Sequence, residues 1–229
     1  MTTDEIKQMV AKRAAEFVTE GMTLGIGTGS TATHLLYALA ARMQAGLRFR
    51  GVPTSEETEK LALRLEIPVI NLDDADHIHL AIDGADEVSR NLDLMKGGGG
   101  AFLQEKMVAF MADQFIVIAD GSKLVNTLGK FPLPVEVVPY GIERIKEHIT
   151  RLGCKKVLLR YRNDKIFITD HGHNVLDCHF DMIPDPVQLN TKLKEIPGVV
   201  ETGLFIQMAD MAMIGYADGS IETITAPPR

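Results

Sequence analysis

Cysteine is scarce in this sequence, which holds only Cys154 and Cys178 among 229 residues. Two cysteines are too few for a disulfide framework and fit a reducing compartment. Long hydrophobic runs are missing too, because none approaches the roughly 18 residues that span a bilayer. Residues 1–17 include Asp4 and Glu5 and lack the apolar stretch of a signal peptide. We therefore expect a cytoplasmic protein with no membrane partner.

An excess of positive charge is also missing. The chain has 24 Lys and Arg against 31 Asp and Glu, which gives a net charge of −7. Nucleic-acid binding depends on clustered lysines and arginines, so we expect no nucleic-acid partner. An acidic protein still binds an anionic small molecule where hydrogen-bond donors are well placed. Function therefore depends on where such donors gather along the chain.

Helical and strand-like patterns alternate over the first 125 residues. Thr3 is the expected N-cap of the first helix, and Thr54 and Glu57 have capping-box spacing at the start of another. Helices are expected at residues 3–17, 32 to about 45, 54–66 and 101–112, and strands at 22–27, 49–52, 68–70, 77–82 and 115–119. This alternation indicates a mostly parallel, doubly wound sheet, which binds ligands at the carboxyl ends of its strands.

The pattern changes after residues 131–134. Alternating runs at 157–161 and 165–169, joined by Asn163 and Asp164, predict a hairpin. The other elements expected here are strands at 135–138 and 174–178 and helices at 142–152 and 187–195. This stretch reads as a small α+β unit with antiparallel pairs. Residues 211–216 and 220–224 predict a closing hairpin.

The sharpest local signal is G-I-G-T-G-S-T at residues 25–31. Glycines at a strand-to-helix turn let backbone N–H groups approach an anion, and hydroxyl side chains add donors, which suits a phosphate monoester. A dinucleotide site fits poorly, because Ser30 stands where the third glycine is needed and Arg48 and Arg50 stand where an acidic residue is expected. A turn that only caps a helix remains the alternative.

Carboxylates and further glycines follow in two later loops. The run D-G-A-D-E at 83–87 follows a predicted strand, where carboxylates suit substrate hydroxyls or acid–base chemistry; a surface turn or a metal site are the alternatives. The run K-G-G-G-G at 96–100 opens the helix that carries Glu105. Four successive glycines are conformationally expensive, so close approach of a ligand explains them better than a flexible linker.

Lys123 lies in a fourth loop, after the predicted strand 115–119. Four such loops after four predicted strands are expected to converge on one edge of one sheet. The histidines carry less weight: His171, His173 and His179 have no common zinc spacing and more often mark a turn and a hairpin face.

In combination and in this order, these motifs resemble the A-type ribose-5-phosphate isomerases nearly end to end. The similarity rests on the runs at 25–31, 83–87 and 96–100, on Glu105 and Lys106, and on G-K-F-P-L-P-V-E-V at 129–137. The runs I-P-G-V-V at 196–200 and G-L-F at 203–205 match as well.

The resemblance implies an α/β fold: a Rossmann-like, mostly parallel sheet domain (residues 1–132 plus 207–229) with a smaller inserted α+β domain (133–206). It implies an aldose–ketose isomerase that interconverts D-ribose 5-phosphate and D-ribulose 5-phosphate in the non-oxidative pentose phosphate pathway, without a metal or another cofactor. A homodimer is the expected assembly, with a tetramer as the alternative.

The same resemblance implies residue roles. Glu105 is the base that moves a proton between C1 and C2 through a cis-enediolate, and Lys96 with the glycine-loop amides stabilises the developing oxyanion. Asp83 and Asp86 bind hydroxyls, and Asp83 assists ring opening. The substrate-binding residues it implies are Thr28, Gly29, Ser30, Thr31, Asp83, Gly84, Ala85, Asp86, Lys96, Gly97, Gly98, Gly99, Lys123 and Lys7, with Ser30, Thr31, Lys7 and Lys123 at the phosphate.

Two other classes share this type of fold. Sugar-phosphate-sensing domains of transcription regulators need a ligand loop but no base, so Glu105 and Lys96 would be unexplained there. Because the first predicted helix begins at Thr3, we expect no DNA-binding module before it. An acyl-CoA transferase of related architecture would form a covalent adduct on a carboxylate, which hydroxylamine labelling would detect.

Overall fold

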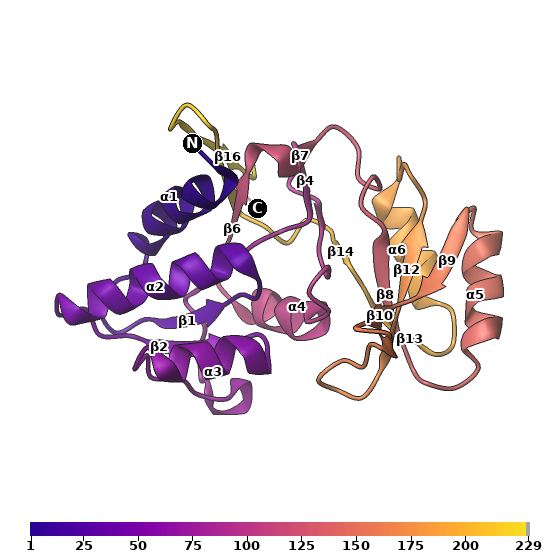
Figure 1. Cartoon of the computed structure of the whole chain (residues 1–229), viewed down its shortest axis with the longest axis horizontal. Helices are drawn as coiled ribbons and strands as arrows, with labels where there is room; N and C mark the ends of the chain where they lie inside the picture. The colour runs from indigo at the N-terminus through magenta and orange to yellow at the C-terminus, as the bar shows by residue number, and fades with distance from the viewer. Residues whose placement is uncertain (228–229) are drawn as a thin grey trace.

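A six-stranded sheet is the centre of the computed structural model, which describes residues 1–227 (Figure 1). The strand order is β16-β15-β6-β3-β1-β2. Neighbouring strands from β15 to β2 are parallel, and only β16 runs antiparallel. The strands are β1 (Thr23–Ile26), β2 (Arg50–Pro53), β3 (Leu80–Asp83), β6 (Phe115–Asp120), β15 (Met211–Gly215) and β16 (Ile221–Thr225). The predicted mostly parallel sheet is confirmed.

Helices cover both faces of this sheet. One apolar core joins it to α1 (Thr3–Ala15), α2 (Ser30–Gln44) and α3 (Glu56–Arg64), and a second joins it to α4 (Phe102–Met111). Because both faces are covered, every residue of β1, β3 and β6 is buried. Within residues 1–227, no helix combines the length and the apolar character that crossing a bilayer requires.

A smaller lobe with a four-stranded antiparallel sheet lies beside the central sheet (Figure 1). Its strand order is β13-β8-β12-β9, and it has its own apolar core with α5 and α6. The elements are β8 (Leu133–Val137), α5 (Ile142–Arg151), β9 (Lys156–Leu159), β12 (Asn174–His179), α6 (Pro186–Lys194) and β13 (Val199–Thr202). The antiparallel pairing predicted for this stretch is confirmed.

The hairpin predicted around Asn163 and Asp164 is present as β10 (Tyr161–Arg162) and β11 (Lys165–Ile166). Both turn residues have positive φ angles, 52° and 58°, as a two-residue turn of this kind requires. Both predicted strands were too long. Most of the first run forms β9, which pairs with β12 instead, and the second strand ends at Ile166, with only an isolated bridge from Ile168 to Asn174.

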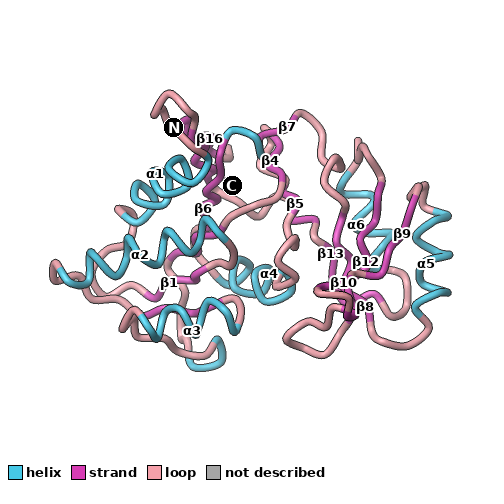
Figure 2. Tube along the Cα trace, in the orientation of Figure 1, coloured by secondary structure: helices cyan, strands magenta, loops and turns pink. Residues whose placement is uncertain are grey.

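A third sheet lies between the other two in the view of Figure 2, and the sequence did not predict it. Its order is β14-β5-β4-β7, with the strands β4 (Glu87–Ser89), β5 (Leu94–Met95), β7 (Leu124–Val125) and β14 (Leu204–Phe205). Strands of two or three residues are too short to show an alternating pattern. The strand predicted at 68–70 was wrong, because Val69 makes only one isolated bridge, to Gly51.

Two predicted helix caps were wrong by one residue. Thr2, not Thr3, caps α1, and its side chain forms a capping box with Glu5. Ser55, not Thr54, caps α3 and accepts a hydrogen bond from the Thr58 N–H. The Thr54 hydroxyl donates instead to the carbonyl of Ile26, because its backbone still extends β2.

The corrected cap of α1 leads to a paired test. Thr2→Ala removes the hydrogen bond from the Glu5 N–H to the Thr2 hydroxyl but keeps the one from the Thr2 N–H to the Glu5 carboxylate. It should lower the free energy of unfolding by about 1 kcal/mol, measured by urea denaturation. Thr3→Ala is the matched control and should change it by less than about 0.5 kcal/mol. A larger effect at Thr3 than at Thr2 would contradict the assignment.

Candidate active site

Four loops converge on a cavity of about 230 Å³ at the carboxyl edge of the central sheet. The loops after β1, β3 and β6 reach it as predicted, but the loop of Lys96 follows β5 of the third sheet. The expectation of four loops from one sheet was therefore wrong for that loop. The predicted site residues that line the cavity are Lys7, Thr28, Gly29, Ser30, Thr31, Gly84, Ala85, Asp86, Lys96, Gly97, Gly98, Gly99, Glu105 and Lys123.

Three charged groups meet beside this cavity: Lys96 and Glu105 line it, whereas Asp83, also predicted to bind substrate, is not among its lining residues. The Lys96 Nζ atom lies 2.9 Å from Asp83 Oδ2 and 3.1 Å from Glu105 Oε2. The three residues are only 3–5% exposed. Lys96 also donates to the Gly84 carbonyl, whereas Glu105 Oε2 accepts no aligned hydrogen bond from residues 1–227. One carboxylate oxygen is thus held beside a cation and remains available for a proton.

Backbone geometry holds Asp83 in place at the end of β3. Its Oδ1 atom accepts hydrogen bonds from the N–H groups of Thr28 and Gly84, at 3.1 and 2.7 Å. A β-carbon at position 27 would lie 1.9 Å from that same oxygen, so only glycine fits beside it. The glycine-rich run after β1 therefore makes room for a buried carboxylate as well as for a ligand.

The electrostatics of the three groups follow from their burial. Burial, and then the neighbouring Asp83, raise the pKa of Glu105 to about 8, against the opposing effect of Lys96. Burial also raises the pKa of Asp83, although Lys96 and two N–H donors oppose it. Burial disfavours the Lys96 ammonium, but Asp83 and Glu105 outweigh it and raise the pKa of Lys96. Near neutral pH, Glu105 is thus close to its own titration point.

The glycine turn, residues 97–100, contributes Gly97, Gly98 and Gly99 to the cavity wall. The Gly98 N–H donates to Asp86 Oδ2 at 2.8 Å, and the Gly100 N–H donates to the Gly97 carbonyl at 3.0 Å. Asp86 therefore orders the turn while its carboxylate lines the cavity. Glu105 lies in the first turn of α4, directly after these glycines.

Cationic and hydroxyl donors gather at another part of the cavity wall. Lys7 reaches from α1 and donates to Ser30 Oγ at 2.9 Å, so the first helix does contribute to the cavity. Lys123 lies in a short 3₁₀ turn (Gly121–Lys123), which Asp120 caps through the Ser122 N–H. Thr31 lines the same cavity. This set can hold a dianionic phosphate.

Some residues that build the site were not predicted. The Thr28 hydroxyl lies within 2.8–3.1 Å of the hydroxyls of Thr54, Ser55 and Thr58, so a buried network fixes the loop after β1. Asp120 also lines the cavity. The spacing of these residues carried no signal, because the network joins segments about 26–30 residues apart.

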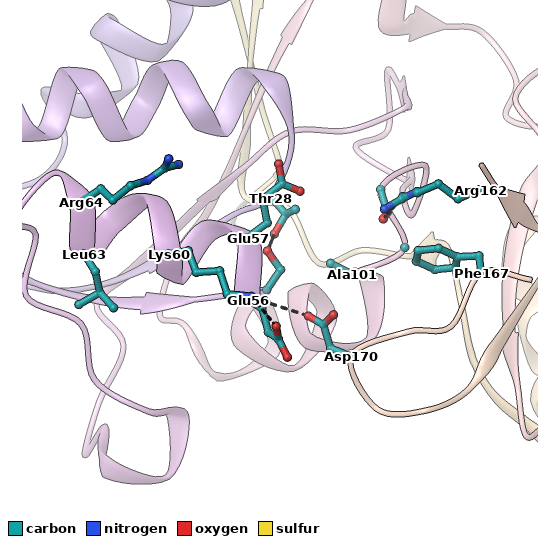
Figure 3. A pocket seen from close by; sticks show the side chains of 13 residues that line it. Thr28, Glu56, Glu57, Lys60, Leu63, Arg64, Ala101, Arg162, Phe167 and Asp170 are labelled. Atoms are coloured by element: carbon teal, nitrogen blue, oxygen red, sulfur yellow. Dashed lines mark hydrogen bonds and ion pairs between the residues drawn. The ribbon is translucent and has the colours of Figure 1, made fainter. Parts of the chain in front are cut away.

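A larger groove of about 720 Å³ adjoins the cavity and shares Thr28 and Gly99 with it. Figure 3 shows this groove between α3 and the small lobe. Asp170 of the small lobe accepts a hydrogen bond from the Glu56 N–H at 3.2 Å, across the groove. The site therefore lies where the two lobes meet.

The histidines lie away from the cavity. His173 contacts the buried Glu136 at 2.9 Å, and His171 belongs to a turn after β11. In residues 1–227, no three His, Cys, Asp or Glu side chains converge in a way that would hold a metal ion.

Comparison with known proteins shows the family of the chain. The family model for ribose 5-phosphate isomerase A (phosphoriboisomerase A) matches residues 50–219. The ribose-5-phosphate isomerase A of Parvibaculum lavamentivorans is 50% identical over 226 residues, which cover 96% of this chain and 98% of that relative. The chain belongs to the ribose 5-phosphate isomerase A family. The relative from Bacillus mycoides is 48% identical over 215 residues, 93% of this chain and 97% of its own length.

Solved structures of the family share the fold. Ribose 5-phosphate isomerase from Plasmodium falciparum has a TM-score of 0.95 and 37% identity, covering 98% of this chain and 100% of that one. A D-ribose-5-phosphate isomerase in complex with phospho-erythronic acid has a TM-score of 0.95 and 38% identity, with the same coverage. The resemblance inferred from the motifs is thereby confirmed, together with the α/β fold class and the prediction of an isomerase.

The raised pKa of Glu105 has a consequence for stability. A carboxyl group whose pKa rises from 4.5 to about 8 on folding stabilises the protein fully below pH 4.5 and loses this contribution as the pH rises towards 8. Glu105→Gln should therefore gain free energy of unfolding relative to the wild type between pH 5 and pH 9, on the order of a few kcal/mol.

Urea denaturation at several pH values measures this difference. Gln104→Ala on the same helix neither adds nor removes a titratable group, so it should show no such trend. A difference between Glu105→Gln and the wild type that stays constant with pH would contradict the raised pKa.

Proposed function

We propose that this protein interconverts D-ribose 5-phosphate and D-ribulose 5-phosphate, as the names of its relatives imply. The observation that carries the proposal is the buried carboxylate of Glu105 at 3.1 Å from the Lys96 ammonium, inside a cavity that also presents phosphate donors. A base beside a cation is what proton abstraction next to a carbonyl group requires. The family membership supports a place in the non-oxidative pentose phosphate pathway.

In the proposed mechanism, Glu105 removes the proton from C2 of the open-chain aldose. The electron pair moves to the carbonyl oxygen O1 and forms a cis-enediolate, and Glu105 then returns the proton to C1. Asp83 carries the hydroxyl proton from O2 to O1, so that O2 becomes the ketone oxygen, and it also assists ring opening. A base with a pKa of about 8 takes up and releases protons readily near neutral pH.

Lys96 and the N–H groups of the glycine turn stabilise the negative charge that develops on oxygen. These donors are fixed before the reaction, since Lys96 is held by Asp83, Glu105 and the Gly84 carbonyl. Fixed donors need no reorganisation in the transition state, and a single one contributes roughly 10²–10³-fold in rate in known enzymes. Asp86, which lines the cavity, binds a substrate hydroxyl.

Lys7, Ser30, Thr31 and Lys123 bind the phosphate in this proposal. The ligand named for one solved relative, phospho-erythronic acid, supports a site that accepts a phosphate together with a second anionic group. It carries a phosphate at one end and a carboxylate at the other, which is the charge pattern of an enediolate phosphate. The cavity offers positive charges and donors that complement these two anionic groups, with Lys7, Lys123 and the hydroxyls at one part and Lys96 at another.

The proposal extends to domains, assembly and location. We assign residues 1–132 plus 207–229 to the catalytic domain and 133–206 to the inserted domain, supported by the separate apolar core of the small lobe. Exposed apolar side chains on α4, with Phe110 82% exposed, support a homodimer, with a tetramer as the alternative. Light scattering would distinguish these from a monomer. The scarcity of cysteine supports a cytoplasmic location.

A metal-free assay with EDTA tests the reaction and the base together. Wild-type protein should convert ribose 5-phosphate to a ketopentose, and Glu105→Gln should lower kcat by roughly 10²–10⁴-fold while still binding substrate. The wild-type kcat/KM should rise with pH up to about 8, because Glu105 acts as the carboxylate.

The exposed Glu147→Gln is the control and should keep the wild-type rate. Substantial activity in Glu105→Gln would assign the base to another residue. Tight binding of the sugar phosphate without conversion by the wild type would instead favour a sensor.

The two lysines should give opposite kinetic signatures. Lys96→Ala should lower kcat more than it weakens substrate binding, because its charge acts on the transition state. Lys123→Ala should mainly raise KM, because it binds a phosphate that is unchanged during the reaction. Steady-state kinetics on both variants measure the split, and a KM effect at Lys96 with an unchanged kcat would contradict these roles.

A further inference from the structure

The small lobe holds the carbonyl side of the glycine turn. Arg160, which follows β9, donates from Nη1 to the Gly97 carbonyl at 2.7 Å and more weakly to the Gly98 carbonyl at 3.4 Å. The rest of its guanidinium is held by Asp177 of β12, through Nε at 3.0 Å and through Nη2. The Arg160 side chain is only 10% exposed. The two contacts with Asp177 fix the orientation of the Arg160 guanidinium, and the glycine turn is hydrogen-bonded to that guanidinium.

The carbonyl contacts determine where the N–H groups of the turn point. In a trans peptide the C=O and the next N–H point in opposite directions. A carbonyl that faces Arg160 therefore directs the following N–H away from the small lobe. The Gly98 N–H is taken by Asp86, but the Gly99 N–H has no acceptor among residues 1–227, and Gly99 lines the cavity. A free donor at a ligand cavity is available to a substrate oxygen.

A second contact from the same lobe reinforces the turn. Arg162 donates to the Gly99 carbonyl at 3.1 Å, and its guanidinium lies 4.5 Å from the ring centroid of Phe167. Figure 3 shows Arg162 and Phe167 on the small-lobe side of the groove. A β-carbon at Gly100 would lie 2.3 Å from the Phe167 ring, so the ring packs directly on the turn. Arg162 is exposed, however, and makes a single bond to the turn, so Arg160 is the main anchor.

We propose that Arg160, backed by Asp177, is a positioning residue for the reaction: by holding the Gly97 and Gly98 carbonyls, it orients the free Gly99 N–H towards the developing oxyanion. The inference rests on the proposed function and adds the small lobe to the catalytic machinery. The guanidinium charge also polarises the peptides that it contacts, which strengthens their N–H groups as donors. The base, the ammonium and the phosphate donors all lie outside this lobe.

Arg160→Gln tests the proposal in the intact protein. We expect kcat to fall by about 10–100-fold while KM for ribose 5-phosphate stays within about threefold, because the phosphate contacts are untouched. Amide hydrogen exchange at residues 97–101 should become faster. Arg160→Lys keeps the positive charge but loses the two-pronged guanidinium, so its kcat should lie between those of the wild type and Arg160→Gln. Asp177→Asn should change kcat in the same direction.

Lys155→Gln is the matched control, because it breaks another ion pair of the small lobe, Lys155 with Asp181, that does not touch the turn. It should leave kcat and exchange at 97–101 unchanged. An unchanged kcat in Arg160→Gln, or a loss that only follows the unfolded fraction, would overturn the inference while an active wild type upholds the proposed function. A wild type without isomerase activity would overturn both.

Discussion

The Lys96 ammonium lies between the Asp83 and Glu105 carboxylates, and all three groups are almost fully removed from solvent. Burying charges is costly unless each is paired and hydrogen-bonded. Asp83 meets this condition through two backbone N–H donors, but Glu105 has only the ion pair. Two carboxylates therefore compete for one cation, and the less satisfied one keeps its proton to a higher pH. Burial is the main cause of the raised pKa of Glu105, and the neighbouring Asp83 charge adds to it.

The rest of the fold holds these three groups together from separate elements. Asp83 ends β3 of the central sheet, Lys96 follows β5 of the third sheet, and Glu105 lies on α4. Helix α4 is in turn held by Lys106, which donates to the Thr202 carbonyl of the small lobe at 2.7 Å and to the Leu204 carbonyl of the third sheet at 2.8 Å. An ion cluster shared by three elements is sensitive to the movement of any of them, which explains why the site lies at their junction.

The correct and incorrect predictions differ in whether the local sequence carries the physical signal. The turn at Asn163 and Asp164 was predicted correctly, because its positive φ angles restrict the residue types that can form it. Covered parallel strands were correct because they are continuous apolar runs. Helix caps at Thr2 and Ser55 were missed by one residue, because neighbouring hydroxyl residues are equivalent until the backbone is known. The third sheet was missed because its strands are two or three residues long.

By itself, the sequence determined the fold class, the glycine-rich loops and the family, because glycine runs and strand-to-helix alternation are local patterns. It also identified Glu105, Lys96 and Asp83 as candidates. Only the tertiary structure decided that these side chains meet within about 3 Å, that Lys7 reaches Ser30, and that Arg160 holds the glycine turn. Burial and hydrogen bonding between distant segments set the charges and directions in the site, and neither can be read from local spacing.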